Sequence, residues 1–292
     1  MRVETRICKI DVADRGICEG DIEKYNKEKM KDSYKTYDVD CHNFDNDEIY
    51  RLLGSVTSDC KDDGKSFQVC DRIEFIKKYL GGSSYELLAE DNLFLLYGKK
   101  QFSVGTSVVL VSSHIDCVYT RCFCEEQGDY YRGTFDNSFT NAVLLYAMKE
   151  EMLPENVVIA FTGDEEHDSA GAIAVNLYLT KKQNPIVFAL VLDVTNVGGD
   201  ENHYFAVEND FGIDLLTAHR IVEGLASYTN LYSYLHNAEP DESWDYSEYG
   251  IPCMTLSATV AGNMHSDEGV LVHRNTFEVY CNALQKVLEV LL

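Results

Sequence analysis

The sequence predicts an α/β fold: a three-layer sandwich in which a central, mostly parallel β-sheet is flanked by helices. Segments typical of strands alternate along the chain with segments of helical periodicity. The apolar strands do not alternate with polar residues, which indicates burial on both faces. Because the chain has only four prolines and no Gly/Ser-rich linker, we expect residues 1–292 to form a single domain, with an irregular amino-terminal cap at 1–65 and a core at 66–292.

The core is expected to begin with a short helix over residues 72–80, because its apolar residues have helical spacing and Gly81-Gly82 follow as a stop signal. Residues 85–97 have the composition of one or two strands. Residues 106–112 are expected to form a buried strand, because four consecutive aliphatic residues occupy its centre.

The rest of the core alternates between helices and strands. An apolar stripe predicts a helix over residues 140–151, and the stripe consists of Ala142, Leu145, Tyr146 and Met148. Further helices are expected over residues 169–180, 210–227 and 276–291. Strands are expected over residues 157–161, 186–192 and 251–257. Parallel strands need crossover helices between them, so this alternation favours a parallel sheet.

Composition limits the classes of partner and location. The chain carries 25 Lys and Arg against 49 Asp and Glu, so its formal net charge is −24. Such a charge disfavours nucleic acid and anionic membranes as partners. No apolar run approaches the roughly 18 residues of a membrane helix, and the first residues lack the apolar region of a secretory signal. We therefore expect a cytoplasmic protein whose ten cysteines, none in a CxxC spacing, are reduced.

Polar residues collect where the predicted strands end, which is where open α/β sheets bind their ligands. Each predicted strand or helix start contributes one group: His114 with Asp116, Asp136, Asp164 with Glu165 and Glu166, Asp193, and His265 with Asp267 and Glu268. Imidazole and carboxylate together are the usual ligands of zinc and related ions. The sequence therefore predicts a metal site at this edge of the sheet.

The individual groups leave alternatives open. His114 and Asp116 share one side of an extended backbone, so Asp116 can orient the imidazole, although such a triplet also occurs by chance. Of Glu165 and Glu166, one can bind a metal while the other serves as general base, or both can belong to a solvated acidic turn. Asp136 can bridge two cations or simply cap the following helix.

The order of these residues resembles that of the co-catalytic zinc exopeptidase superfamily, peptidase clan MH. The order is His114-x-Asp116, Asp136-Asn137, Glu165-Glu166, Asp193 and His265. Flanking segments also resemble family motifs, namely Thr162-Gly163-Asp164 with Gly171-Ala172, Gly250-Ile251-Pro252 and Asn263-Met264 before His265. The resemblance covers roughly residues 70–292 and is closest to the compact single-domain leucyl-type aminopeptidases, so it implies a zinc aminopeptidase-like fold.

The resemblance also implies roles for these residues. His114 and Asp193 bind one metal, Glu166 and His265 bind the other, and Asp136 bridges them. Glu165 is then the general base, and Asp116 holds His114. The implied cofactors are two divalent ions, zinc in the first place, with cobalt or manganese as alternatives. In the implied mechanism a metal-bridging hydroxide attacks a peptide carbonyl and Glu165 carries the proton to the leaving amine. His273 is the alternative to His265.

The branch of the family decides the expected substrate. Only 71 residues separate Asp193 from His265, too few for the dimerisation domain of other branches, so the expected activity is that of an aminopeptidase on a peptide or small amide substrate. An ammonium group can be held by an acidic residue among Asp241, Glu242 and Asp245. A substrate carboxylate can be held by Arg121, Arg132 or Arg274. A deacylase of N-acyl amino acids, a non-catalytic binding protein with this fold, and assembly as a homo-oligomer remain open.

Overall fold

The computed structural model describes residues 44–57, 71–99, 103–199 and 203–292, of which those from Asp45 onward belong to one compact unit. Most of the predicted cap at 1–65 therefore lies outside the described residues, and the division into cap and core stays a prediction. Within it, Asn46–Val56 forms a regular helix, α2, where no element was predicted. Asp45 begins this helix, because its carboxylate accepts hydrogen bonds from the backbone N–H groups of Asp47 and Glu48.

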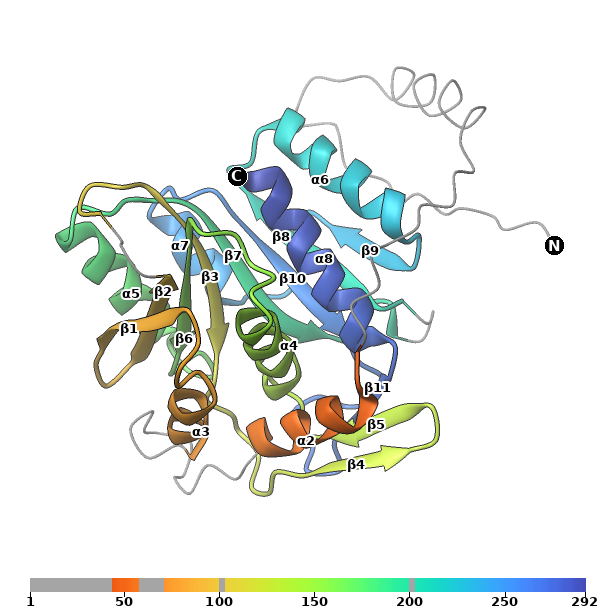
Figure 1. Cartoon of the computed structure of the whole chain (residues 1–292). Coiled ribbons are helices and arrows are strands. Elements are labelled where there is room, and N and C mark those ends of the chain that lie inside the picture. Colours follow the sequence, from red (N-terminus) through yellow and green to blue (C-terminus); the bar gives the residue numbers. More distant parts are fainter. Residues whose placement is uncertain (1–43, 58–70, 100–102, 200–202) are drawn as a thin grey trace, which may run out of the picture. The chain divides into compact units, whose positions relative to one another are not determined.

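An eight-stranded sheet forms the centre of this unit, in the order β1-β2-β6-β3-β7-β10-β8-β9 (Figure 1). Its strands are β1 (Tyr85–Glu90), β2 (Phe94–Lys99), β3 (Val108–His114), β6 (Val157–Thr162), β7 (Ile186–Thr195), β8 (Phe205–Phe211), β9 (Tyr232–Leu235) and β10 (Cys253–Thr259). The four central strands are parallel to one another, and β8 and β9 are parallel as a pair. The predicted α/β fold with a mostly parallel sheet is confirmed.

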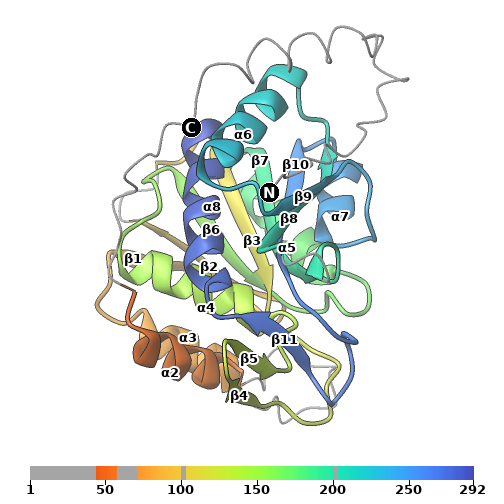
Figure 2. The same ribbon diagram turned by 90° about the vertical axis from the view of Figure 1, so that its right-hand side faces the viewer.

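Helices cover both faces of the sheet. These are α3 (Asp71–Tyr79), α4 (Ser138–Lys149), α5 (Ala170–Lys181), α6 (Leu215–Tyr228), α7 (Glu242–Glu248) and α8 (Thr276–Leu291). Figure 2 shows α8 lying across one face beside α6 and α4, and α5 and α7 pack together on the opposite face. Every residue of β3, β6 and β10 is buried, which explains why these strands read as continuous runs without polar alternation.

A second, three-stranded sheet lies outside the large one and was not predicted. It consists of β4 (Cys124–Gln127), β5 (Tyr130–Gly133) and β11 (Val270–His273), in the order β11-β5-β4. Gly269 lies directly before β11, where the backbone comes close to β5. Its φ is +70°, and a Cβ there would lie 2.6 Å from the carbonyl oxygen of Gly133, so this position requires glycine. This sheet fixes the loops that lead to Asp136 and away from His265.

The carboxyl-terminal half differs most from the prediction. The helix expected over residues 210–227 begins only at Leu215, because the Asp214 carboxylate accepts hydrogen bonds from the N–H groups of Leu216 and Thr217. The residues before it form the unpredicted strand β8, and β9 and α7 were not predicted either. Among the described residues, no helix has the length and apolar character needed to cross a membrane.

Candidate metal centre

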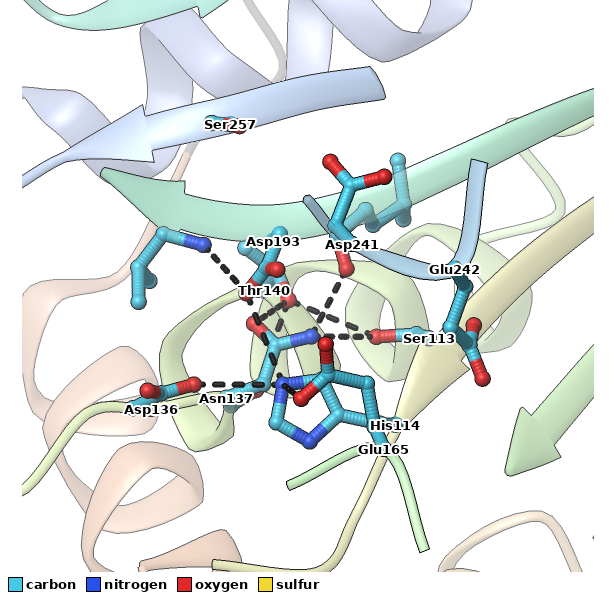
Figure 3. Close-up of polar contacts among 12 residues, drawn as sticks. Ser113, His114, Asp136, Asn137, Thr140, Glu165, Asp193, Asp241, Glu242 and Ser257 are labelled. Carbon is cyan, nitrogen blue, oxygen red and sulfur yellow. Dashed lines mark hydrogen bonds and ion pairs between the residues drawn. The ribbon is translucent and has the colours of Figure 1, made fainter. Parts of the chain in front are cut away.

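Figure 3 shows four of the predicted site residues close together beside the carboxyl ends of the central strands, namely His114, Asp136, Glu165 and Asp193. His114 is the last residue of β3 and lies beside Thr162, the last residue of β6. Asp193 lies near the end of β7 and pairs with Ser257 of β10. These parallel strands end at the same edge, so the backbone places their polar side chains close together before any ligand is considered.

The first group of candidate ligands is built around His114. Its Nε2 lies 3.1 Å from Oδ1 of Asp136 and 3.5 Å from Oδ1 of Asp193. One donor atom from each of the three residues lies within 4.8 Å of the others. The His114 side chain is only 2% exposed, so this group is held in the interior by the sheet.

The second group uses the other oxygen of the same aspartate. Oδ2 of Asp136 lies 2.9 Å from Nε2 of His265, and that nitrogen lies 3.8 Å from Oε2 of Glu166. Donor atoms of Asp136, Glu166 and His265 also lie within 4.8 Å of one another. Asp136 thus belongs to both groups, which is the arrangement needed to bridge two cations.

Asp116 links the end of β3 to the acidic turn after β6. Its Oδ1 lies 3.5 Å from Nδ1 of His114, on the side of the ring opposite the candidate ligands. Its two oxygens accept hydrogen bonds from the N–H groups of Glu165, at 3.3 Å, and Glu166, at 3.2 Å. A carboxylate behind a histidine ligand fixes the orientation of the ring. The same contacts also set the position of both glutamates.

Two asparagines hold the Asp136 loop: Asn137, which follows Asp136 in the order given above, and Asn141, which sequence reasoning did not single out. Nδ2 of Asn137 donates to the carbonyl oxygen of Leu192 at 2.7 Å and to Oγ of Ser113 at 3.1 Å. Nδ2 of Asn141 donates to the carbonyl oxygen of His114 at 2.6 Å. Asn137, and not Asp136, occupies the N-cap position of α4, and its side chain makes no capping hydrogen bond, so the alternative reading of Asp136 as the helix cap is wrong.

The loop that carries His265 is fixed at two further points. The carboxylate of Asp267 accepts hydrogen bonds from the backbone N–H of Thr120, at 2.9 Å, and from its hydroxyl group. Nε of Arg132 donates to the carbonyl oxygen of Glu268 at 3.1 Å. Asp267 and Glu268 therefore hold the loop and do not join either group of candidate ligands.

His273, the alternative to His265, lies elsewhere. Its Nδ1 accepts a hydrogen bond from the N–H of Asn275 at 3.1 Å, and its ring packs edge-on against Tyr130. It is therefore engaged on β11 and belongs to neither group of candidate ligands.

The electrostatics of the centre reflect several carboxylates crowded into a buried space. Burial raises the pKa of Glu165 to about 9, and the nearby charges of Asp193 and Glu242 act in the same direction. Burial likewise raises the pKa of Glu166 to about 7 and that of Asp193 to about 6. Burial would also raise the pKa of Asp136, but the adjacent imidazoles of His114 and His265 outweigh it and hold that pKa below the ordinary value.

The donor atoms fit divalent cations. Among the described residues, buried atoms without a hydrogen-bond partner include both ring nitrogens of His114, Oδ1 of Asp136 and Oε1 of Glu166. Buried polar atoms are normally paired, so atoms left in this state need another partner. Nitrogen and carboxylate oxygen are the ligands that zinc and its neighbours in the first transition row accept.

Comparison with known proteins identifies the family. The sequence model of "Peptidase family M28" matches residues 95–276, more than half of the chain, and that range contains every residue of both groups as well as Asp116 and Glu165. The chain belongs to peptidase family M28. It is accordingly a hydrolase, a metal-dependent peptidase. No curated protein matches its sequence.

Solved structures with the same fold are distant in sequence. A TET aminopeptidase from a marine sediment Thaumarchaeota archaeon has a TM-score of 0.66 at 11% identity, covering 83% of this chain and 96% of its own. An aminopeptidase from the archaeon Desulfurococcus kamchatkensis has a TM-score of 0.64 at 13% identity, covering 84% and 95%. PhTET1-12s, solved as a dodecamer, has a TM-score of 0.59 at 13% identity, covering 81% and 98%. At these identities the likeness shows the fold.

Proposed function

We propose that this M28 family member is an aminopeptidase that uses two divalent metal ions to remove residues from the amino terminus of peptides. The observation that carries the proposal is the pair of donor groups that share Asp136. His114 and Asp193 would hold one ion, Glu166 and His265 the other, and Asp136 both. When bound, such ions lower the pKa of water to near 7 and polarise a substrate carbonyl. Zinc is the first candidate, with cobalt and manganese as alternatives.

Glu165 is the general base in this proposal. Its Oε2 lies 3.8 Å from Nε2 of His114, yet Glu165 belongs to neither donor group. Burial and the neighbouring carboxylates raise its pKa in the metal-free chain. Two bound cations would oppose that rise and favour the ionised form, which can take a proton from water and pass it to the leaving amine. Asp116 supports this step by fixing the backbone N–H of Glu165 and the ring of His114.

The charged residues around the centre favour a substrate with a free amino group. Two of the three arginines considered for binding a carboxylate are already engaged: Arg132 with the Glu268 carbonyl, and Arg274 with Glu126 at 2.9 Å. The carboxylate of Glu242 lies close enough to Glu165 to raise its pKa. This excess of negative charge supports recognition of an ammonium group over recognition of a carboxylate.

The proposal is tested by Glu165→Gln together with a substrate panel. The zinc-loaded wild-type chain is expected to cleave aminoacyl-nitroanilides and dipeptides and to leave N-acyl amino acids intact. Glu165→Gln is expected to lose at least about 100-fold in kcat, the usual range for a general base, while keeping its metal content. The matched control is Glu208→Gln, which alters a buried carboxylate outside both donor groups. Hydrolysis by Glu165→Gln at the wild-type rate contradicts the base assignment, and preference for N-acyl substrates contradicts the aminopeptidase assignment.

Assembly is a separate expectation. The structural relative PhTET1-12s was solved as a dodecamer, which supports a homo-oligomer for this chain as well. Light scattering on the purified full chain checks this, and a mass of 33.1 kDa, that of one chain, contradicts it.

A further inference from the structure

Tyr119 is a residue near the proposed centre that no step above uses. It lies in the loop between β3 and β4, five residues after His114. Its hydroxyl oxygen is buried, and the proton of this hydroxyl has no hydrogen-bond acceptor among the described residues. A buried O–H donor without an acceptor costs free energy, so its position calls for an explanation.

The surroundings of this hydroxyl group belong to the second donor group. The charges of Asp136 and Glu166 both act on the phenol, and the backbone N–H groups of Asp136 and His265 act on its oxygen. A tyrosine has an ordinary pKa of about 10, so the phenol keeps its proton at neutral pH and is available as a hydrogen-bond donor.

The loop holds this donor in a fixed place. Nη1 of Arg72 donates to the carbonyl oxygen of Ile115 at 3.0 Å, and the N–H of Ile115 donates to the carbonyl oxygen of Thr162 at 2.8 Å. On the other side of Tyr119, Thr120 is bound through its N–H and hydroxyl groups to the carboxylate of Asp267. Tyr119 thus lies between two fixed points of its loop. One is the backbone hydrogen bond of Ile115 to β6, and the other is the pair of hydrogen bonds from Thr120 to the His265 loop.

The other buried phenols without an acceptor lie in different surroundings. Tyr85 and Tyr131 also have buried hydroxyl groups whose protons have no hydrogen-bond acceptor among the described residues. The charged groups that act on Tyr131 are Arg274, Glu126 and Asp47, and the one that acts on Tyr85 is Glu151; none of them is a candidate ligand. Of these phenols, Tyr119 is the one whose donor faces charges of the centre.

We propose that Tyr119 is a catalytic residue whose phenolic O–H donates a hydrogen bond to the oxygen of the scissile carbonyl as that oxygen gains negative charge. This inference rests on the proposed peptidase function. In that function the oxygens of Asp136 and Glu166 are occupied as ligands, so the phenolic proton is left for the substrate. A fixed donor of this kind stabilises the transition state more than the bound substrate, because the charge on the oxygen develops during the reaction.

The test compares Tyr119→Phe with Tyr131→Phe in the zinc-loaded full chain. Both variants delete one buried phenolic hydroxyl whose proton has no hydrogen-bond acceptor in the described structure, so they match in the change made and differ in its place. Tyr119→Phe is expected to lower kcat roughly 100-fold, the usual cost of losing one oxyanion donor, with KM changed less than about threefold. Tyr131→Phe is expected to keep kcat within about threefold of the wild type.

Two further readouts separate catalysis from metal positioning. Zinc content, measured by atomic emission, is expected to be the same in Tyr119→Phe and the wild type. Calorimetric binding of leucine phosphonic acid, a tetrahedral anion, is expected to weaken about tenfold in Tyr119→Phe, which corresponds to the loss of one good hydrogen bond. Loss of zinc together with kcat, restored by excess zinc, overturns the proposal because Tyr119 then only positions a ligand.

The remaining outcomes are also decisive. If kcat of Tyr119→Phe stays within threefold of that of Tyr131→Phe while the wild type is active, the inference about Tyr119 is wrong and the peptidase function stands. If the zinc-loaded wild type cleaves no peptide, the proposed function fails, and the inference fails with it.

Discussion

Metal removal should make the stability of the chain depend on pH in a way that zinc reverses. Burial raises the pKa of Glu166 from 4.5 to about 7, that of Asp193 from 3.8 to about 6 and that of Glu165 from 4.5 to about 9. Between pH 5 and pH 7 the unfolded chain has these carboxyls ionised, whereas the metal-free folded chain keeps them partly protonated. The folded state therefore binds more protons, and its stability falls as the pH rises.

The size of the effect follows from the number of protons involved. These pKa values keep more than one of the three carboxyl protons bound in this pH range, and one net proton, taken as the lower bound, gives a slope of about 1.4 kcal/mol per pH unit. Over two pH units this amounts to about 3 kcal/mol, or roughly 6–12 °C in Tm for a unit of this length. The pKa of His114 is also raised, so losing its proton as the pH rises acts in the same direction.

Zinc isolates the contribution of the centre. Bound ions keep the ligand carboxylates ionised, so the stabilisation by zinc should grow from pH 5 to pH 7. Glu208 and Glu242, whose burial also raises their pKa to about 7, are outside both donor groups, and their own pH dependence is present in the metal-free and the zinc-loaded chain alike. Urea unfolding followed by circular dichroism, with and without chelator, measures both slopes. A metal-free stability that is flat or rises between pH 5 and pH 7 refutes this reasoning.

Three further predictions concern single side chains. His265→Ala should lose one of two zinc ions while Asp136→Ala loses both, as measured by zinc content; equal loss in the two variants contradicts the shared role of Asp136. Asp116→Asn should lower zinc affinity about 10- to 100-fold, the usual effect of a residue behind a histidine ligand, and an unchanged affinity in a competition assay contradicts this. Leu110→Ala, in the centre of β3, should lower the free energy of unfolding by about 2–5 kcal/mol, and the zinc content at 25 °C should stay at the wild-type value.

The alternation of apolar segments was enough to predict the central sheet, because burial on both faces leaves continuous apolar runs such as β3 and β6. The same logic failed for β8. That strand is buried, but Glu208, Asn209 and Asp210 occupy its second half. Their side chains are satisfied by residues distant in sequence, as when Ser257 donates to Glu208 at 2.6 Å. A local pattern contains no information about such partners, so residues 205–209 were assigned to no element and Asp210 was taken as the start of the predicted helix.

The candidate ligands were predictable for a related reason, whereas the residues that support them were not. Metal ions bind only a few types of side chain, and parallel strands end at the same edge of a sheet. The residue type and the position at a strand end together were therefore enough to predict His114 and Asp193 as ligands. The residue types of Asn137 and Tyr119 do not indicate a site in the sequence, because asparagine and tyrosine occur throughout proteins. Their roles depend on contacts made only in the folded chain.

The two donor groups differ in how firmly the fold holds them. His114 ends a buried strand and is 2% exposed, whereas His265 lies in a loop and is 54% exposed. His265 adopts a left-handed backbone conformation with a φ of +62°, which a residue other than glycine keeps only where its surroundings enforce it. Here the surroundings are the contacts of Asp267 with Thr120 and of Glu268 with Arg132. The first group is therefore built into the sheet, while the second depends on two loops staying together.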